Sequence, residues 1–137
     1  MCPSLAPTAH RRLAFPPGER GAEVRRGIDF VRLTLAHWRP GTEAAAVDDV
    51  LLVAAELITN AVDHADGPVA VELWLAVRGG RLRIDVTDTS PAEPRILAVE
   101  PGEPHHRGLR IVDHIAHAWG HRPEGVGKTV WAELHLP

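Results

Sequence analysis

Residues 44–65 of the chain read AAAVDDVLLVAAELITNAVDHA, and this stretch decides the fold. Apolar side chains recur along it at intervals of three and four residues, the spacing that places them on one face of an α-helix. Residues 50–55 are apolar all round, so we expect other elements to cover this helix on more than one side. Its predicted core face consists of Val47, Val50, Leu51, Ala54, Leu57, Ile58, Ala61 and Ala65.

Upstream of this helix, the sequence predicts a strand and a first helix. Residues 9–15 (AHRRLAF) are predicted to form a short edge strand, which the Pro-Pro-Gly segment after it ends. The first helix is expected over residues 22–38, up to the Pro-Gly pair that follows Arg39. Thr42 is suited to cap the start of the next helix, with Glu43 in its first turn.

Downstream of the quoted stretch, alternating apolar residues predict strands over 68–77 and 81–88, joined as a hairpin at Gly79-Gly80. Residues 89–106 contain four prolines and are expected to form a surface loop. A third helix is predicted over 108–119 and a last strand over 128–136. Helices that cover one face of a mixed, mostly antiparallel sheet make an α+β two-layer sandwich, so we expect a single domain over residues 1–137.

The composition is typical of one soluble globular domain, because 45% of the 137 residues are apolar and 24% are charged. No uninterrupted apolar run approaches the roughly 18 residues that a membrane-spanning helix needs. The first twenty residues contain no continuous apolar segment behind a basic start, so no secretory signal is predicted. Cys2 is the only cysteine, so no intramolecular disulfide is expected, and the predicted location is cytoplasmic.

The formal net charge of −3 argues against nucleic-acid binding, because surfaces that follow phosphates need an excess of positive charge. The charge is unevenly distributed, since residues 1–40 carry seven arginines against three acidic residues. A DNA-binding arm is therefore one interpretation of the basic first helix. Arg25, Arg26 and Arg32 fit the solvated face of that helix equally well.

Polar residues interrupt the apolar pattern at three places, and the first is on the helix quoted above. Glu56, Asn60 and Asp63 stand at positions i, i+4 and i+7, so they form one polar line along the helix. In one interpretation this line is an ordinary solvated face. In the other it lines a cavity, where Glu56 accepts a proton from an attacking hydroxyl and Asn60 offers its carbonyl oxygen to Mg²⁺.

The second place is Asp88, which continues the inward parity of Leu82, Ile84 and Val86 along its strand. A carboxylate that points toward the core is costly unless something hydrogen-bonds to it. Asp88 therefore either caps the turn over residues 89–91 or accepts a hydrogen bond from an exocyclic amine, such as that of adenine.

The third place is the entry to the third helix, where Arg107 precedes Gly108 and Leu109. Free N–H groups at a helix start, with an arginine beside them, are suited to hold phosphate. A lone glycine at a helix start is also a common cap, so both interpretations stay open.

Two further motifs resemble a phosphate-binding loop and a zinc site, and we interpret neither as such a site. The string Gly127-Lys128-Thr129 looks like the end of a P-loop, but a strand is predicted after it instead of a helix. His114 and His117 stand one helical turn apart with other histidines nearby in the sequence. Without a clear carboxylate or cysteine partner, they are interpreted as surface histidines and not as a zinc site.

Four segments together resemble the motifs of the gyrase, chaperone, histidine-kinase and mismatch-repair (GHKL) ATPase superfamily, in particular its anti-sigma-factor kinase branch. Residues 56–65 (ELITNAVDHA) resemble the N box, and residues 85–91 (DVTDTSP) resemble the adenine-recognition box. Residues 106–113 (HRGLRIVD) resemble the second glycine box, and residues 125–131 (GVGKTVW) resemble the closing strand. The resemblance covers nearly the whole chain and implies a Bergerat-type ATP-binding fold.

By this resemblance, Glu56 is the general base, Asn60 is the Mg²⁺ ligand and Asp88 is the acceptor for adenine. Arg107, Gly108 and Leu109 belong to the lid over ATP. Three other residues are implied near the nucleotide, namely Asp63, Lys128 and Thr129.

The sequence also departs from the family pattern. Thr89 and Ser90 stand in place of the glycines that usually follow the adenine-box aspartate, and His106 replaces the first glycine of the second box. Asp63 stands where many relatives carry a basic residue, which would place a negative charge near the phosphates. Lys128 occupies a position often held by threonine, so either Lys128 or its neighbour Thr129 serves the nucleotide.

The resemblance implies a serine/threonine protein kinase that uses ATP and Mg²⁺ to phosphorylate a small antagonist protein in a bacterial partner-switching pathway. The alternative is a non-catalytic, ATP-dependent module that binds a sigma factor or an antagonist without transferring phosphate. The intact Glu56 favours the kinase, whereas the altered glycine boxes and Asp63 favour the module. The expected partners are a sigma factor, an antagonist protein or a second copy in a homodimer, with no membrane and no nucleic acid.

Overall fold

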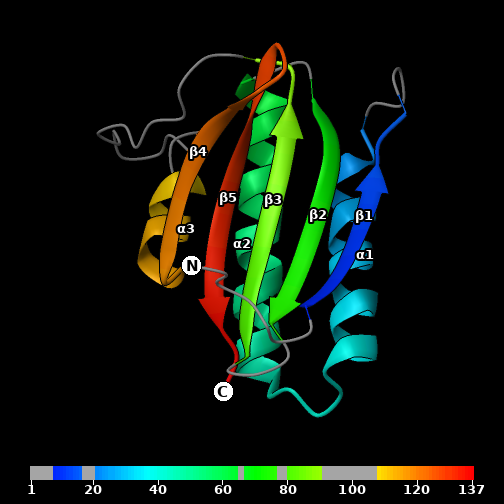
Figure 1. The fold of residues 1–137 in the computed structure, drawn as a ribbon, viewed down its shortest axis with the longest axis vertical. Helices are drawn as coiled ribbons and strands as arrows, with labels where there is room; N and C mark the ends of the chain where they lie inside the picture. The colour runs from blue at the N-terminus through cyan, green and yellow to red at the C-terminus, as the bar shows by residue number, and fades with distance from the viewer. Residues whose placement is uncertain (1–7, 17–20, 65–66, 77–79, 91–107) are drawn as a thin grey trace.

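The computed structural model describes residues 8–16, 21–64, 67–76, 80–90 and 108–137. Within these residues, five strands form one sheet, and three helices lie against one of its faces (Figure 1). In chain order the elements are β1 (Thr8–Ala14), α1 (Glu23–Trp38), α2 (Ala44–His64), β2 (Pro68–Ala76), β3 (Arg81–Asp88), α3 (Gly108–Ile115), β4 (Ala118–Glu124) and β5 (Gly127–His135).

The strand order in the sheet is β1-β2-β3-β5-β4, and each of these neighbouring pairs is antiparallel. The predicted α+β two-layer architecture is confirmed, and so are the β2–β3 hairpin and the edge position of β1. A mixed sheet was expected, and the pairings that the structure describes contain no parallel member. Antiparallel neighbours need no helical crossover between them, which leaves the helices free to gather on one face.

The core lies between the helices and the inward face of the sheet. Alternate residues of β2, β3 and β5 point inward and are buried, namely Val71, Leu73, Leu75, Leu82, Ile84, Val86, Val130, Ala132 and Leu134. Helix α2 packs on this face between α1 and α3, as its all-round apolar stretch predicts. It contributes Val50, Val53, Ala54, Leu57, Ile58 and Ala61 to the core.

Helix α1 approaches α2 closely at Gly27. A Cβ atom at this position would collide with the Cδ1 atom of Ile58, so a larger residue here would require the end of that flexible side chain to move. The turn between them differs from the sequence expectation. Thr42 was expected to cap α2, but the helix begins at Ala44 and the Thr42 hydroxyl donates to the backbone carbonyl of Arg39 over 2.7 Å. Thr42 therefore stabilises the turn at the end of α1.

Helix α3 is shorter than predicted, and a strand follows it. The prediction of helix over 108–119 is wrong beyond Ile115, because residues 118–124 form β4 and pair with β5. Gly120 and Pro123 disfavour a helix there, and the unpaired edge of β5 offers backbone partners instead. Trp119 still packs against the core, as the apolar pattern predicts, but from a strand.

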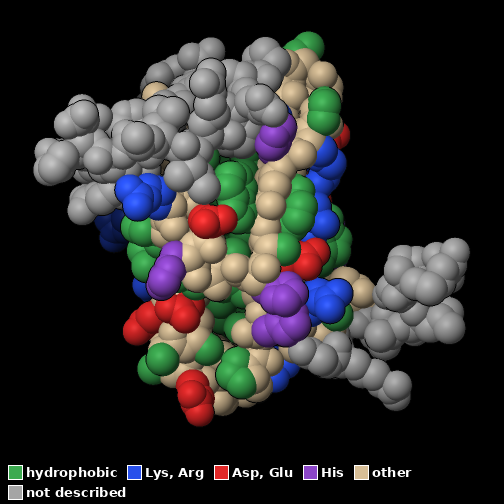
Figure 2. Space-filling view, turned by 90° about the vertical axis from the view of Figure 1, so that its left-hand side faces the viewer, with side chains coloured by type: hydrophobic (Ala, Val, Ile, Leu, Met, Phe, Trp, Pro, Cys, Tyr) green, Lys and Arg blue, Asp and Glu red, His purple; other side chains and the backbone are tan. Residues whose placement is uncertain are grey.

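The edge formed by α3 and β4 is rich in histidine. Figure 2 faces this edge and shows histidine side chains at several separate places over it. The rings of His117 and His135 lie 4.3 Å apart, and these two residues are exposed, as are His114 and His121. Within the described ranges, no three histidine, cysteine or acidic side chains gather closely enough to hold a metal ion.

Replacement of a core side chain on α2 provides a test of this packing. Leu57 is 1% exposed, so we expect Leu57→Ala to lower the free energy of unfolding by about 2–5 kcal/mol, through lost burial and the cavity left behind. Leu33→Ala is the matched control, because Leu33 is 67% exposed, and its effect should stay within about 0.5 kcal/mol. Urea denaturation measures both, and equal effects would contradict the described core.

Candidate functional site

Asp88 ends β3 with its side chain on the face of the sheet that the helices cover. The side chain is only 1% exposed, although it carries a carboxylate. The backbone N–H of Ser90 donates to its Oδ1 atom over 2.8 Å. The interpretation of Asp88 as a cap for the turn after β3 is therefore confirmed, and its second oxygen stays available to another donor.

That donor is Lys128, which lies directly opposite Asp88 in the register of β3 and β5. Its Nζ atom lies 3.1 Å from Oδ1 and 3.0 Å from Oδ2 of the carboxylate. A third contact of 3.1 Å joins Nζ to the backbone carbonyl of Ser90. Because the Lys128 side chain is 5% exposed, this is a buried ion pair whose charges are satisfied by each other and by the turn.

Gly127 permits the close approach that brings these two charges together. A Cβ atom at Gly127 would collide with the backbone carbonyl oxygen of Asp88 and would lie 2.7 Å from Cα of Thr89. The start of β5 therefore packs directly on the turn that follows β3. Residues 127–129 begin a strand, in agreement with the interpretation that they are not part of a P-loop.

The polar line of Glu56, Asn60 and Asp63 lies on one helix, α2, as predicted. Glu56 and Asn60 are half-buried, whereas Asp63, further along the helix, is exposed. Glu56 and Asp63 both take part in polar interactions. Within the part of the chain that the structure describes, Asn60 forms no side-chain hydrogen bond, so its amide has free donors and a free carbonyl oxygen.

These features lie toward one end of the domain. The C-terminal part of α2, the end of β3 and the start of β5 all lie at the top of Figure 1. Helix α3, whose first residue is Gly108, packs against α2. Leu109 is 4% exposed and belongs to the hydrophobic core. The expectation for Arg107 concerns a residue outside the described ranges.

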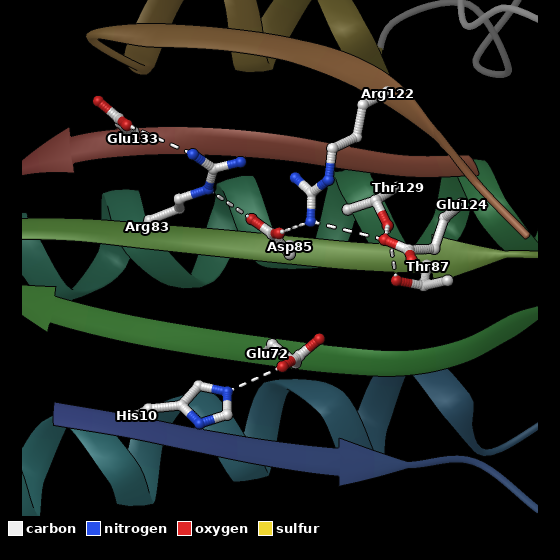
Figure 3. A network of polar contacts seen from close by, with 9 residues as sticks. All are labelled: His10, Glu72, Arg83, Asp85, Thr87, Arg122, Glu124, Thr129 and Glu133. Atoms are coloured by element: carbon white, nitrogen blue, oxygen red, sulfur yellow. Dashed lines mark hydrogen bonds and ion pairs between the residues drawn. The ribbon is translucent and has the colours of Figure 1, made fainter.

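Thr129 is separated from the other expected site residues by the sheet itself. Side chains alternate along a strand, so Lys128 faces the helices and Thr129 faces the side of the sheet away from the helices. There the hydroxyl of Thr129 lies 2.8 Å from that of Thr87 and 3.4 Å from a carboxylate oxygen of Glu124 (Figure 3). Of the two alternatives that the sequence left open, only Lys128 is in contact with Asp88.

The face of the sheet away from the helices also holds a second buried carboxylate, Asp85. Its side chain is 1% exposed, and it accepts hydrogen bonds from Arg83 over 2.8 Å and from Arg122 over 3.0 Å (Figure 3). The Arg83 guanidinium lies 4.7 Å from the ring centre of Trp131, which covers it further. Asp85 therefore joins β3 to β4 and faces away from Asp88, although both belong to one sequence motif.

Sequence reasoning did not identify the Asp85 cluster. The alternation along this strand could have indicated it. If Leu82, Ile84 and Val86 point inward, the residues between them point to the other face of the sheet, and these include Arg83 and Asp85. The second arginine, Arg122, could not be identified from the sequence, because it belongs to β4, which was not predicted.

Comparisons with known proteins identify the family and the fold. The sequence matches the family model described as "Histidine kinase-like ATPase domain" over residues 22–134, so the chain belongs to this family of ATPase domains. The fold is similar to the crystal structure of the RsbU and RsbW domains of Rv1364c from Mycobacterium tuberculosis, with a TM-score of 0.64 and 19% sequence identity. The similarity covers 95% of this chain and 32% of that chain, so this chain spans about a third of that protein's length.

No curated protein matches the sequence. Among the described residues, no helix combines the length and the hydropathy required to cross a membrane.

Loss of one member of the buried ion pair should destabilise the protein. Lys128→Met leaves the Asp88 carboxylate buried without its cation, so we expect a loss of about 3–5 kcal/mol in the free energy of unfolding. The control is Arg32→Met, which removes an ion pair with Asp29 whose two side chains are each 54% exposed, and its effect should stay within about 1 kcal/mol. Chemical denaturation compares the two variants, and a neutral Lys128→Met would show that the pair does not stabilise the fold.

Proposed function

We propose that this protein binds ATP and transfers its γ-phosphoryl group to a serine or threonine of a small antagonist protein. The observation that carries the proposal is the position of Asp88, a buried carboxylate on the helix-covered side of the sheet, at the same end of the domain as the polar line of α2. Membership in the histidine kinase-like ATPase family supports nucleotide binding. A cytoplasmic location suits such an activity.

The base of the nucleotide is assigned to Asp88. A carboxylate oxygen accepts a hydrogen bond from the exocyclic amine of adenine, whereas guanine presents a carbonyl oxygen at that position and would repel it. Lys128, which contacts both carboxylate oxygens, is the neighbour most able to modify this interaction.

The phosphates are assigned to the end of α2 and the start of α3. Asn60 suits a hard cation, because its carbonyl oxygen is free of hydrogen bonds within the described chain, and Mg²⁺ bound there would neutralise charge on the phosphates. Asp63 stands one turn further along and is exposed toward solvent. In the proposed lid, Arg107 and the N–H groups of Gly108 and Leu109 hold the phosphate oxygens.

Glu56 is assigned the role of general base. It stands one helical turn before Asn60 and is half-buried, so it can face a hydroxyl that approaches the phosphates held at Asn60. Its carboxylate accepts the proton of the attacking serine or threonine and orients the hydroxyl oxygen in line with the bond that breaks.

The partners are proposed from the resemblance of the sequence motifs. The sequence resemblance to anti-sigma-factor kinases supports a sigma factor or an antagonist protein as the partner, either with one copy of this chain or with a homodimer. The candidate second function is an ATP-dependent interaction module without phosphoryl transfer. It is favoured by the ion pair that occupies Asp88 and by the negative charge of Asp63 near the proposed phosphate site.

The assignment of Asn60 is tested by its removal. Asn60→Ala should weaken ATP binding in the presence of Mg²⁺ by about 10-fold or more and leave binding without Mg²⁺ nearly unchanged, because the amide oxygen acts through the cation. Thr59→Ala, on the same turn of α2, is the matched control. Calorimetric titration measures both affinities, and an unchanged response of Asn60→Ala to Mg²⁺ would remove Asn60 from the site.

The role of Glu56 separates the kinase from the module. Glu56→Gln keeps the shape and helix propensity of the side chain, so ATP affinity should stay the same while phosphoryl transfer slows about 10²–10⁴-fold. Glu43→Gln, an exposed glutamate ahead of α2, is the control. Single-turnover assays with the purified partner decide between the two functions. A wild-type protein that binds its partner only with ATP, yet transfers no phosphate, is the module.

A further inference from the structure

Lys128 is the only lysine in the chain, and its ammonium lies in the interior. The other positive side chains are arginines, and those that form ion pairs on the sheet are much more exposed, at 33% for Arg83 and 44% for Arg122. A lysine stem is long and flexible enough to carry the charge to water. The burial of this ammonium therefore results from its contacts with Asp88 and the turn.

The hydrogen-bonding capacity of the pair is nearly exhausted. An ammonium has three N–H donors, and Lys128 has three acceptors within 3.1 Å, namely Oδ1 and Oδ2 of Asp88 and the carbonyl of Ser90. Asp88 also accepts the N–H of Ser90, so only about one of its roughly four lone-pair sites is unused. The Asp88 side chain is 1% exposed and Lys128 contacts both of its oxygens, so a further strong donor at this carboxylate competes with Lys128.

We propose that Lys128 is a latch on the base site and thereby sets the affinity for the nucleotide. This inference rests on the proposed function, in which Asp88 accepts the adenine amine. The amine and the ammonium compete for the same buried carboxylate, and the base enters only when Lys128 gives up at least one of its contacts. ATP affinity is lowered by the free energy of that exchange, and Lys128 is an affinity-determining residue that need not touch the phosphates.

The backbone around the pair holds the latch in place. The register sets Lys128 opposite Asp88, and the close approach at Gly127 fixes the start of β5 against the turn after β3. The latch therefore opens through rotation of the lysine side chain, because the two strands cannot separate without loss of their pairing.

The affinity for ATP tests the latch. Lys128→Met removes the ammonium and keeps an apolar stem of similar length, so the amine meets no competitor, and we expect ATP affinity to rise about 10- to 100-fold, the range for a hydrogen bond to a charged group. Lys128→Arg is the contrasting variant. Its guanidinium can bind both oxygens of Asp88 and exchanges partners less readily, so this variant should bind ATP no more tightly than the wild type. Calorimetry with Mg²⁺-ATP measures all three proteins.

The outcomes distinguish the latch from the proposed function. If the wild type binds ATP and Lys128→Met binds it no more tightly, the latch is wrong and ATP binding stands. If none of the three proteins binds ATP, the proposed function fails and the latch fails with it.

A second measurement keeps the test decisive if Lys128→Met does not fold. Because the chain contains one lysine, wild-type protein labelled with ¹³C-lysine gives a single side-chain Cε resonance in NMR. The latch requires this resonance to shift or broaden when ATP saturates the protein, because the ammonium leaves at least one partner. A resonance that stays unchanged while ATP binds would overturn the latch.

Discussion

The charge of Asp88 is the constraint on which the rest of the site depends. Its carboxylate lies on the helix-covered face of the sheet, where an unpaired charge would cost several kcal/mol. The backbone N–H of Ser90 and the ammonium of Lys128 both donate hydrogen bonds to this carboxylate and so offset the cost of burying its charge. The fold thus keeps a charged acceptor in its interior, at the end of the domain where the polar line of α2 ends.

Strand β3 carries two buried carboxylates, Asp85 and Asp88, which lie on opposite faces of the sheet and are held by different partners. Asp85 is held by two arginines from two strands, on the face away from the helices, and it joins β3 to β4. Asp88 is held by one flexible lysine, on the face that packs against α2. Two planar guanidinium groups make a rigid clamp, whereas a single ammonium is a point charge that can exchange partners. The second arrangement suits a carboxylate that binds a ligand.

Much of this architecture follows from the sequence, because its strongest signals are local. The three helices, the β2–β3 hairpin and the inward parity of Asp88 were predicted from periodicity, and the N-box resemblance gave the family. Strand β4 was not predicted. It is stabilised by its pairing with β5, and the local pattern of this short segment, which contains Gly120 and Pro123, does not reveal that pairing. The Asp88–Lys128 pair was missed for the same reason: residues forty positions apart meet only through the register of two strands.

The central claim is that the Asp88 end of the domain binds the adenine of ATP. A crystal structure of the protein with Mg²⁺ and a non-hydrolysable ATP analogue tests it most directly. The account predicts the exocyclic amine within hydrogen-bonding distance of the Asp88 carboxylate and the phosphates near Asn60 and the start of α3. A nucleotide bound elsewhere, with the Asp88–Lys128 pair unchanged, would contradict it.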